Sequence, residues 1–133
     1  MASAHEQATS ALRIVRGPGK GRGVRAGRPF ANGEVIDRAP VVVVSAREWE
    51  LVEQTVLGHF AFRWDEDKGS VAIALSQGSL FNHSYEPNVA SDKDVRGRRI
   101  VFSAVRDIAP GEELTINYNG DLQSREPVGF EVR

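Results

Sequence analysis

The sequence contains no cysteine. Disulfide scaffolds, thiolate zinc sites, iron–sulfur clusters and cysteine nucleophiles all need that sulfur atom, so its absence excludes all of them. A metal site would have to use oxygen and nitrogen ligands. The histidines, His5, His59 and His83, are far apart in the sequence and never show H-x-x-x-H spacing. We therefore expect no metal.

Long apolar runs are also missing, because no stretch approaches the roughly 18 consecutive residues that a membrane helix needs. Residues 1–10 are small and polar, without the cationic start and apolar stretch of a secretory signal, and they predict a disordered N-terminus. We expect an intracellular protein with no membrane partner, cytoplasmic in a bacterium and with a nuclear location left open. A length of 133 residues suits one hydrophobic core and one domain.

Net charge is nearly absent, at −1 with a pI near 6.3, which makes nucleic acid an unlikely partner. The charges are nevertheless unevenly distributed. A basic run without any acid between Glu6 and Glu34 could attract phosphates or another anion, or it could be a solvated face balanced by acids at residues 65–67 and 112–113. The run comprises Arg13, Arg16, Lys20, Arg22, Arg25 and Arg28.

Alternating apolar and polar residues predict several short strands and a mainly β fold. The expected strands cover residues 11–16, 24–26, 34–44, 60–64, 71–75, 99–105 and 113–118. One helix is expected, because Ser45 and Glu48 form a capping-box pattern and Gly58 stands where a C-terminal cap would lie. The apolar stripe of this helix, which includes Val56 and Leu57, is expected to pack on the core.

A glycine-rich loop at residues 17–23 does not match either familiar phosphate motif. A P-loop needs Ser or Thr after Gly-Lys, but Gly21 follows Lys20. The dinucleotide fingerprint needs a helix after the glycines, but a strand is expected there. Without other information, the loop indicates a tight turn or a close approach of backbone to a ligand.

A loop at residues 78–89 combines amides, an imidazole, hydroxyls and aromatic rings, more polar recognition capacity than a connector needs. The sequence contains no G-x-S-x-G elbow, so it does not support a serine hydrolase. Glu112 and Glu113 follow a turn and are expected to be solvated. The sequences N-H-S-x-x-P-N at 82–88, E-L-T-x-x-Y at 113–118 and K-G-R-G-V at 20–24 together resemble the signature of SET-domain protein lysine methyltransferases.

That resemblance covers residues 11–119 and implies a SET domain of several small sheets, one clear helix and a knot-like crossing, followed by a short tail at 120–133 without zinc. It implies S-adenosylmethionine as methyl donor and a lysine-containing protein or peptide as substrate, with a histone or other basic tail as an option. Tyr118 would be the catalytic residue. The donor-binding residues would be Lys20, Gly21, Arg22, Gly23, Asn82, His83, Tyr118 and Phe130. The substrate channel would include Phe60, Phe62, Tyr85 and Ile116.

Departures from the family pattern keep alternatives open. The chain has only two tyrosines, Tyr85 and Tyr118, where family members commonly place more along the lysine channel. A SET-like domain that binds donor or peptide without turnover is therefore the alternative function. Ile116 stands where the family often has Phe or Tyr, which leaves the number of transferred methyl groups open. A homodimer could complete the peptide groove of so short a domain.

Overall fold

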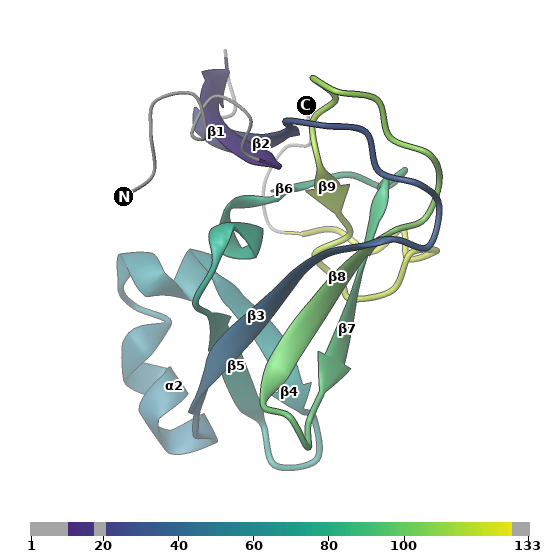
Figure 1. The fold of residues 1–133 in the computed structure, drawn as a ribbon. Helices are drawn as coiled ribbons and strands as arrows, with labels where there is room; N and C mark the ends of the chain where they lie inside the picture. The colour runs from purple at the N-terminus through teal and green to yellow at the C-terminus, as the bar shows by residue number, and fades with distance from the viewer. Residues whose placement is uncertain (1–10, 18–20, 129–133) are drawn as a thin grey trace, which may run out of the picture.

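Strands are the main secondary structure of the protein, whose computed structural model describes residues 11–17 and 21–128 (Figure 1). The expectations for residues 1–10, Lys20 and Phe130 lie outside these residues. The strands are β1 (Leu12–Gly17), β2 (Gly21–Ala26), β3 (Val35–Val44), β4 (Ala61–Asp65), β5 (Ser70–Ala74), β6 (Asn82–His83), β7 (Val89–Asp94), β8 (Arg99–Ala104) and β9 (Thr115–Ile116). The helical elements are α2 (Ala46–Val52) and the 3-10 turns η1 (Val56–His59) and η2 (Gln77–Leu80).

These strands form three sheets. β1 pairs with β2, β6 pairs with β9, and the five-stranded sheet has the order β4-β5-β3-β8-β7. The mainly β, several-sheet fold class expected from the sequence is confirmed. No helix among the described residues is long and apolar enough to cross a membrane.

The long strand β3 runs through Pro40, as the sequence predicted. It pairs with β8 up to Pro40 and with β5 from Val41 onward. A proline has no N–H to donate, so it is tolerated best where a ladder ends. Pro40 lies where the strand changes partner, and its carbonyl accepts a hydrogen bond from the Leu75 N–H at 2.8 Å.

The predicted helix begins correctly at Ser45, whose side chain accepts from the Glu48 N–H in a complete capping box. The predicted end at Gly58 is wrong, because α2 ends at Val52. Thr55 is extended and its side chain accepts from the Leu57 N–H, which starts η1 instead of another α-helical turn. The expectation of core packing is wrong for Val56 and Leu57, which are 70% and 48% exposed.

Strand β7 was not predicted from the sequence. Its polar residues from Ser91 to Asp94 show no apolar alternation, yet they pair with β8 in a regular antiparallel register. The strand expected over residues 113–118 is shorter than predicted and covers only Thr115–Ile116. Long-range pairing, not local pattern, determines both outcomes.

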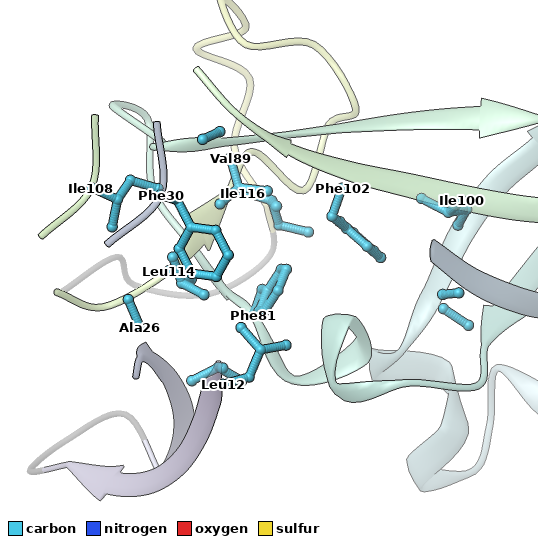
Figure 2. Packing of buried hydrophobic residues seen from close by; sticks show 14 of the residues in the cluster. Leu12, Ala26, Phe30, Phe81, Val89, Ile100, Phe102, Ile108, Leu114 and Ile116 are labelled. Carbon is cyan, nitrogen blue, oxygen red and sulfur yellow. The ribbon is translucent and has the colours of Figure 1, made fainter. Parts of the chain in front are cut away.

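Aromatic and aliphatic side chains from all three sheets form the core (Figure 2). The Phe81 and Phe102 rings meet edge to face with centroids 5.1 Å apart. A Cβ at Gly78 would overlap the Phe102 ring, so η2 can approach this ring only through glycine. Because Phe81 and Ile116 are anchored in this core, the polar residues that follow them are held at fixed positions.

Candidate active site

The two motif segments of the sequence lie side by side in the parallel pair β6–β9 (Figure 1). Asn82 is opposite Thr115 and His83 is opposite Ile116. The Ser84 N–H extends the pairing with a 2.9 Å hydrogen bond to the Ile116 carbonyl. This pairing brings Asn82 close to the segment that ends in Tyr118.

Asn88, which is only 3% exposed, fixes this crossing. Its amide nitrogen donates to the Glu113 carbonyl at 2.8 Å, and its amide oxygen accepts from the Thr115 N–H at 2.9 Å. Asn88 therefore bonds the main chain on both sides of Leu114. The last residue of N-H-S-x-x-P-N consequently has a structural function.

The glycine-rich loop reaches the crossing at Gly23. The Asn82 amide donates to the Arg22 carbonyl at 3.3 Å and to the Glu113 carboxylate at 2.7 Å. A Cβ on Gly23 would lie 2.7 Å from both the Asn82 nitrogen and a Glu113 oxygen, closer than real Cβ contacts. A side chain at this position would therefore displace the Asn82 amide and the Glu113 carboxylate. The predicted donor-binding residues Arg22, Gly23 and Asn82 are brought together.

Glu113 was expected to be solvated with Glu112, and that expectation is wrong for Glu113. Glu113 is half-buried and accepts from Asn82. The Glu112 side chain is 33% exposed and accepts from Arg106 at 2.9 Å. Sequence reasoning missed Glu113 because its partner amide belongs to a segment 31 residues away.

His83 holds the backbone of Tyr118. Its ring is 4% exposed, and its Nδ1 accepts the Tyr118 N–H at 2.9 Å. Burial lowers the pKa of His83, which favours the neutral ring that this acceptor role requires. The ring also lies 5.2 Å from the Tyr118 ring, centroid to centroid. His83 is therefore a positioning residue for Tyr118.

This arrangement predicts a loss of stability in mild acid. Because the folded pKa of His83 is depressed, the unfolded chain binds more protons, and stability falls as pH drops below the unfolded value of about 6.5. Urea midpoints at pH 7.5 and pH 5.5 should therefore differ for the wild type. The difference should shrink in His83→Asn, whose amide oxygen can replace Nδ1 as acceptor. An equal difference in both proteins would contradict this role.

Tyr118 presents a protonated hydroxyl at the edge of a groove. The hydroxyl donates to the Phe81 carbonyl at 2.8 Å, and the side chain remains 40% exposed. Burial, and secondarily the charge of Glu113, raises the pKa of Tyr118 to about 12. The phenol therefore stays neutral at physiological pH, so it can orient a ligand but does not act as a base.

The groove beside Tyr118 has a volume of about 340 Å³, and we call it the tyrosine groove. Of the predicted channel residues, Phe62 lines it together with Tyr118. Phe60, Tyr85 and Ile116 are not among its lining residues: Phe60 is half-buried beyond η1, and Ile116 is 2% exposed in the core. The hydroxyl of Tyr85 donates to the Glu126 carbonyl at 2.9 Å.

Two amides hold the described part of the tail against the site. Asn117, 3% exposed, donates to the Ser124 carbonyl at 2.9 Å. Asn119 donates to the Glu126 carbonyl at 2.9 Å, the same carbonyl that Tyr85 reaches. Sequence reasoning missed both asparagines. The pair of amides flanking Tyr118, just before a polar tail, was the available signal.

A larger hollow of about 740 Å³ lies between the start of α2 and the β4–β5 turn. It shares Glu66 and Lys93 with the tyrosine groove. Lys93 of β7 also donates to the Trp64 carbonyl of β4, so the two edges of the five-stranded sheet approach each other here. We call this the acidic hollow, because its lining includes Glu48, Asp65, Glu66 and Asp67.

The family model of the SET domain matches residues 21–119, a range that contains the glycine loop, the β6–β9 crossing and Tyr118. The chain belongs to the SET-domain family. The resemblance of three sequence motifs to the SET-domain family is thus confirmed. Among the described residues, this SET domain has no group of three or more His, Asp or Glu that could hold a metal ion.

Histone methyltransferases are among the relatives of this SET domain. It is 40% identical over 104 residues to a histone-lysine N-methyltransferase of Schizosaccharomyces pombe specific for H3 lysine-37, covering 77% of this chain and 69% of the relative. It is 35% identical over 100 residues to an H3 lysine-36 specific enzyme of Aspergillus oryzae, covering 71% of this chain and only 10% of the relative.

A solved structure supports the fold of this SET domain. A crystal structure from Plasmodium falciparum, described as that of a histone methyltransferase, superimposes with a TM-score of 0.60 and 22% identity. The match covers 82% of this chain and 93% of the other.

Proposed function

We propose that this SET domain transfers a methyl group from S-adenosylmethionine to a lysine side-chain amine in a basic protein tail such as that of a histone. One observation carries the proposal: the β6–β9 crossing collects Gly23, Asn82 and Tyr118 from three distant segments. Protein lysine methylation is the activity of the family's histone-lysine methyltransferase relatives. We propose an intracellular location, because a histone substrate is found inside the cell.

The residues at the glycine loop fit the donor. Gly21 adopts a left-handed φ of 66° with open space around its Cβ position, so the backbone there is accessible to a ligand. The Asn82 amide oxygen accepts no hydrogen bond from the described residues, so it can accept one from the donor's ammonium group. When bound, S-adenosylmethionine would supply an electrophilic methyl group on a sulfonium. Arg22 and Asn82 would hold it beside Tyr118.

Tyr118 would orient the lysine amine. The amine must be neutral to attack, and a free lysine with a pKa near 10.4 loses its proton at pH 7 at a cost of about 4.6 kcal/mol. A partly apolar groove and the positive sulfonium of the bound donor would both lower the pKa of the lysine amine, so a strong base is not needed. The Tyr118 hydroxyl donates a hydrogen bond to the Phe81 carbonyl, and its oxygen would accept one from the amine. Alignment of the two reactants then supplies most of the rate.

The acidic hollow supports a basic substrate. Four carboxylates and two lysines, Lys68 and Lys93, line it, which leaves an excess of negative charge, and it adjoins the tyrosine groove through Glu66 and Lys93. A peptide with its target lysine at Tyr118 could place a neighbouring arginine or lysine in the acidic hollow. Opposite charges across such a surface favour the correct register more than they raise affinity.

Gly23→Ala is expected to weaken donor binding at least tenfold, because the added methyl group displaces the Asn82 amide and Glu113. A loss of one ligand hydrogen bond is worth about that factor. Titration calorimetry with S-adenosylmethionine measures it. Gly17→Ala in the same hairpin is the matched control, since its Cβ would meet nothing within 4 Å. Wild-type donor affinity in Gly23→Ala, with thermal melting unchanged, would argue against this site.

The function itself is tested with an array of lysine-containing peptides, S-adenosylmethionine and mass spectrometry. Methylation of basic peptides is expected, and the masses also report how many methyl groups are added. Donor binding without any methylated peptide would instead support the non-catalytic binding module. The homodimer stays a prediction, which light scattering at working concentration tests.

A further inference from the structure

The side-chain amide of Asn82 has two acceptors on its nitrogen, and they come from different segments. The nitrogen donates to a carboxylate oxygen of Glu113 at 2.7 Å and to the main-chain carbonyl of Arg22 at 3.3 Å. An asparagine amide has two N–H donors, so these acceptors occupy its nitrogen end and leave its oxygen end for a ligand. The protein itself therefore sets the orientation of the amide.

Glu113 is the acceptor that decides this orientation. The two ends of an amide have nearly the same shape, so their hydrogen-bond partners determine which way each end faces. An ionised carboxylate accepts hydrogen bonds and has none to donate, so a reversed amide would place two oxygens in a short repulsive contact. The Arg22 carbonyl favours the same orientation through a longer contact. Loss of the Glu113 carboxylate would therefore remove most of the preference.

The main chain on both sides holds the Glu113 side chain in place. The Glu113 carbonyl accepts from the Asn88 amide at 2.8 Å, and the Leu114 N–H donates to a carbonyl of β2 at 2.8 Å. Leu114 is fully buried, so the alternation of an extended chain directs Glu113 away from the core. Gly23 leaves room for the carboxylate to reach Asn82, because a Cβ there would lie 2.7 Å from the Glu113 Oε2.

We propose that Glu113 is a positioning residue for the methyl donor, because it fixes the Asn82 amide with the oxygen toward the donor's ammonium group. The inference rests on the proposed function, which identifies the ligand as S-adenosylmethionine. An amide oxygen accepts a hydrogen bond from an ammonium group, whereas the nitrogen end of the amide has no acceptor to offer. Orientation of a binding group in advance raises affinity, because the cost of ordering the group is not incurred on binding.

Titration calorimetry with Glu113→Gln measures the effect. Glutamine keeps the size of the side chain but can donate to the Asn82 oxygen, so the reversed amide becomes available. We expect the affinity for S-adenosylmethionine to fall about tenfold. Glu112→Gln is the matched control, because it removes the same charge from the neighbouring residue, whose carboxylate accepts from Arg106 and from the Ala109 N–H. Its affinity should stay within about twofold of the wild type.

Two further ligands separate this role from a direct effect of the Glu113 charge. Burial, and secondarily that charge, raises the pKa of Tyr118 to about 12, so the carboxylate is near enough to act on a sulfonium as well. S-Adenosylhomocysteine keeps the ammonium group but has a neutral sulfur, and 5′-methylthioadenosine has neither positive group. Glu113→Gln should weaken S-adenosylmethionine and S-adenosylhomocysteine by the same factor and leave 5′-methylthioadenosine unchanged. Weakening of S-adenosylmethionine alone would overturn the proposal.

NMR of the protein without ligand tests the orientation itself, after thermal melting has established that the variants fold. The side-chain amide protons of Asn82 should exchange slowly with water in the wild type, because both have acceptors. Their signals should shift in Glu113→Gln and stay unchanged in Glu112→Gln. Rapid exchange in the wild type would overturn the proposal, as would wild-type donor affinity in Glu113→Gln.

A role that acts through Asn82 must disappear when Asn82 is removed. In the Asn82→Ala background, Glu113→Gln should leave donor affinity unchanged, whereas a second loss of equal size would show an independent effect and overturn the proposal. Peptide methylation is measured separately. Donor affinity that depends on Glu113, with no methylated peptide, would mean that the proposed enzyme fails and the positioning role stands. Methylated peptides with donor affinity independent of Glu113 would mean the reverse.

Discussion

Tyr118→Phe is expected to lower kcat for peptide methylation about a hundredfold while KM and the melting temperature change little. The substitution keeps the ring beside His83 and removes only the hydroxyl, which the Phe81 carbonyl holds at 2.8 Å. Without that oxygen the lysine amine loses its orienting partner, and small misplacements of reacting atoms cost about this factor. Steady-state kinetics with a basic lysine peptide measure the effect.

Tyr85→Phe is the matched control, because it removes the other tyrosine hydroxyl of the chain. That hydroxyl donates to the Glu126 carbonyl and not to the groove. Its loss should reduce kcat less than about threefold, since it removes one exposed hydrogen bond in the tail. Equal kcat losses in both variants would mean that the Tyr118 hydroxyl has no special place in the reaction.

Asn88→Ala is expected to lower the free energy of unfolding by about 2–4 kcal/mol. The change leaves the Glu113 carbonyl and the Thr115 N–H without their partner in a buried environment. Each unsatisfied buried group costs about 1–3 kcal/mol. Urea denaturation measures the loss, and donor affinity should fall with it because the Glu113 segment also sets the Asn82 side chain.

Asn119→Ala provides the comparison for Asn88→Ala. It removes an amide that makes one exposed hydrogen bond, to the Glu126 carbonyl, and should cost about 0.5–1 kcal/mol. A urea midpoint for Asn88→Ala that equals the wild-type midpoint would contradict the role of Asn88 in fixing the crossing.

The fold could be predicted where the local pattern is strong. Alternation located most strands, and Ser45 with Glu48 located the start of α2. Prediction failed where distant parts of the chain decide, or where two local signals compete. The residues of β7 are mostly polar and show no strand pattern, and only their pairing with β8 makes them a strand. The α2 helix ends early because Thr55 caps a separate turn, which competes with continuation toward Gly58.

The site could be predicted as a set of residues but only partly as a geometry. The motif resemblance identified Asn82, His83 and Tyr118, which do meet at β6–β9. It could not show that His83 accepts from the Tyr118 backbone or that Glu113 accepts from Asn82, because both contacts join residues more than 30 positions apart. Solvent exposure of a carboxylate depends on such contacts, not on its neighbours in sequence.

Methyl transfer to lysine is tested most directly with isotopically labelled S-adenosylmethionine and two peptides that differ at one position. One basic peptide contains a single lysine, and its partner has arginine there. Fragmentation by mass spectrometry should locate the labelled methyl group on the lysine nitrogen, with none on the arginine peptide and about a hundredfold less with Tyr118→Phe. Bound donor with no label on either peptide would contradict the proposed enzyme.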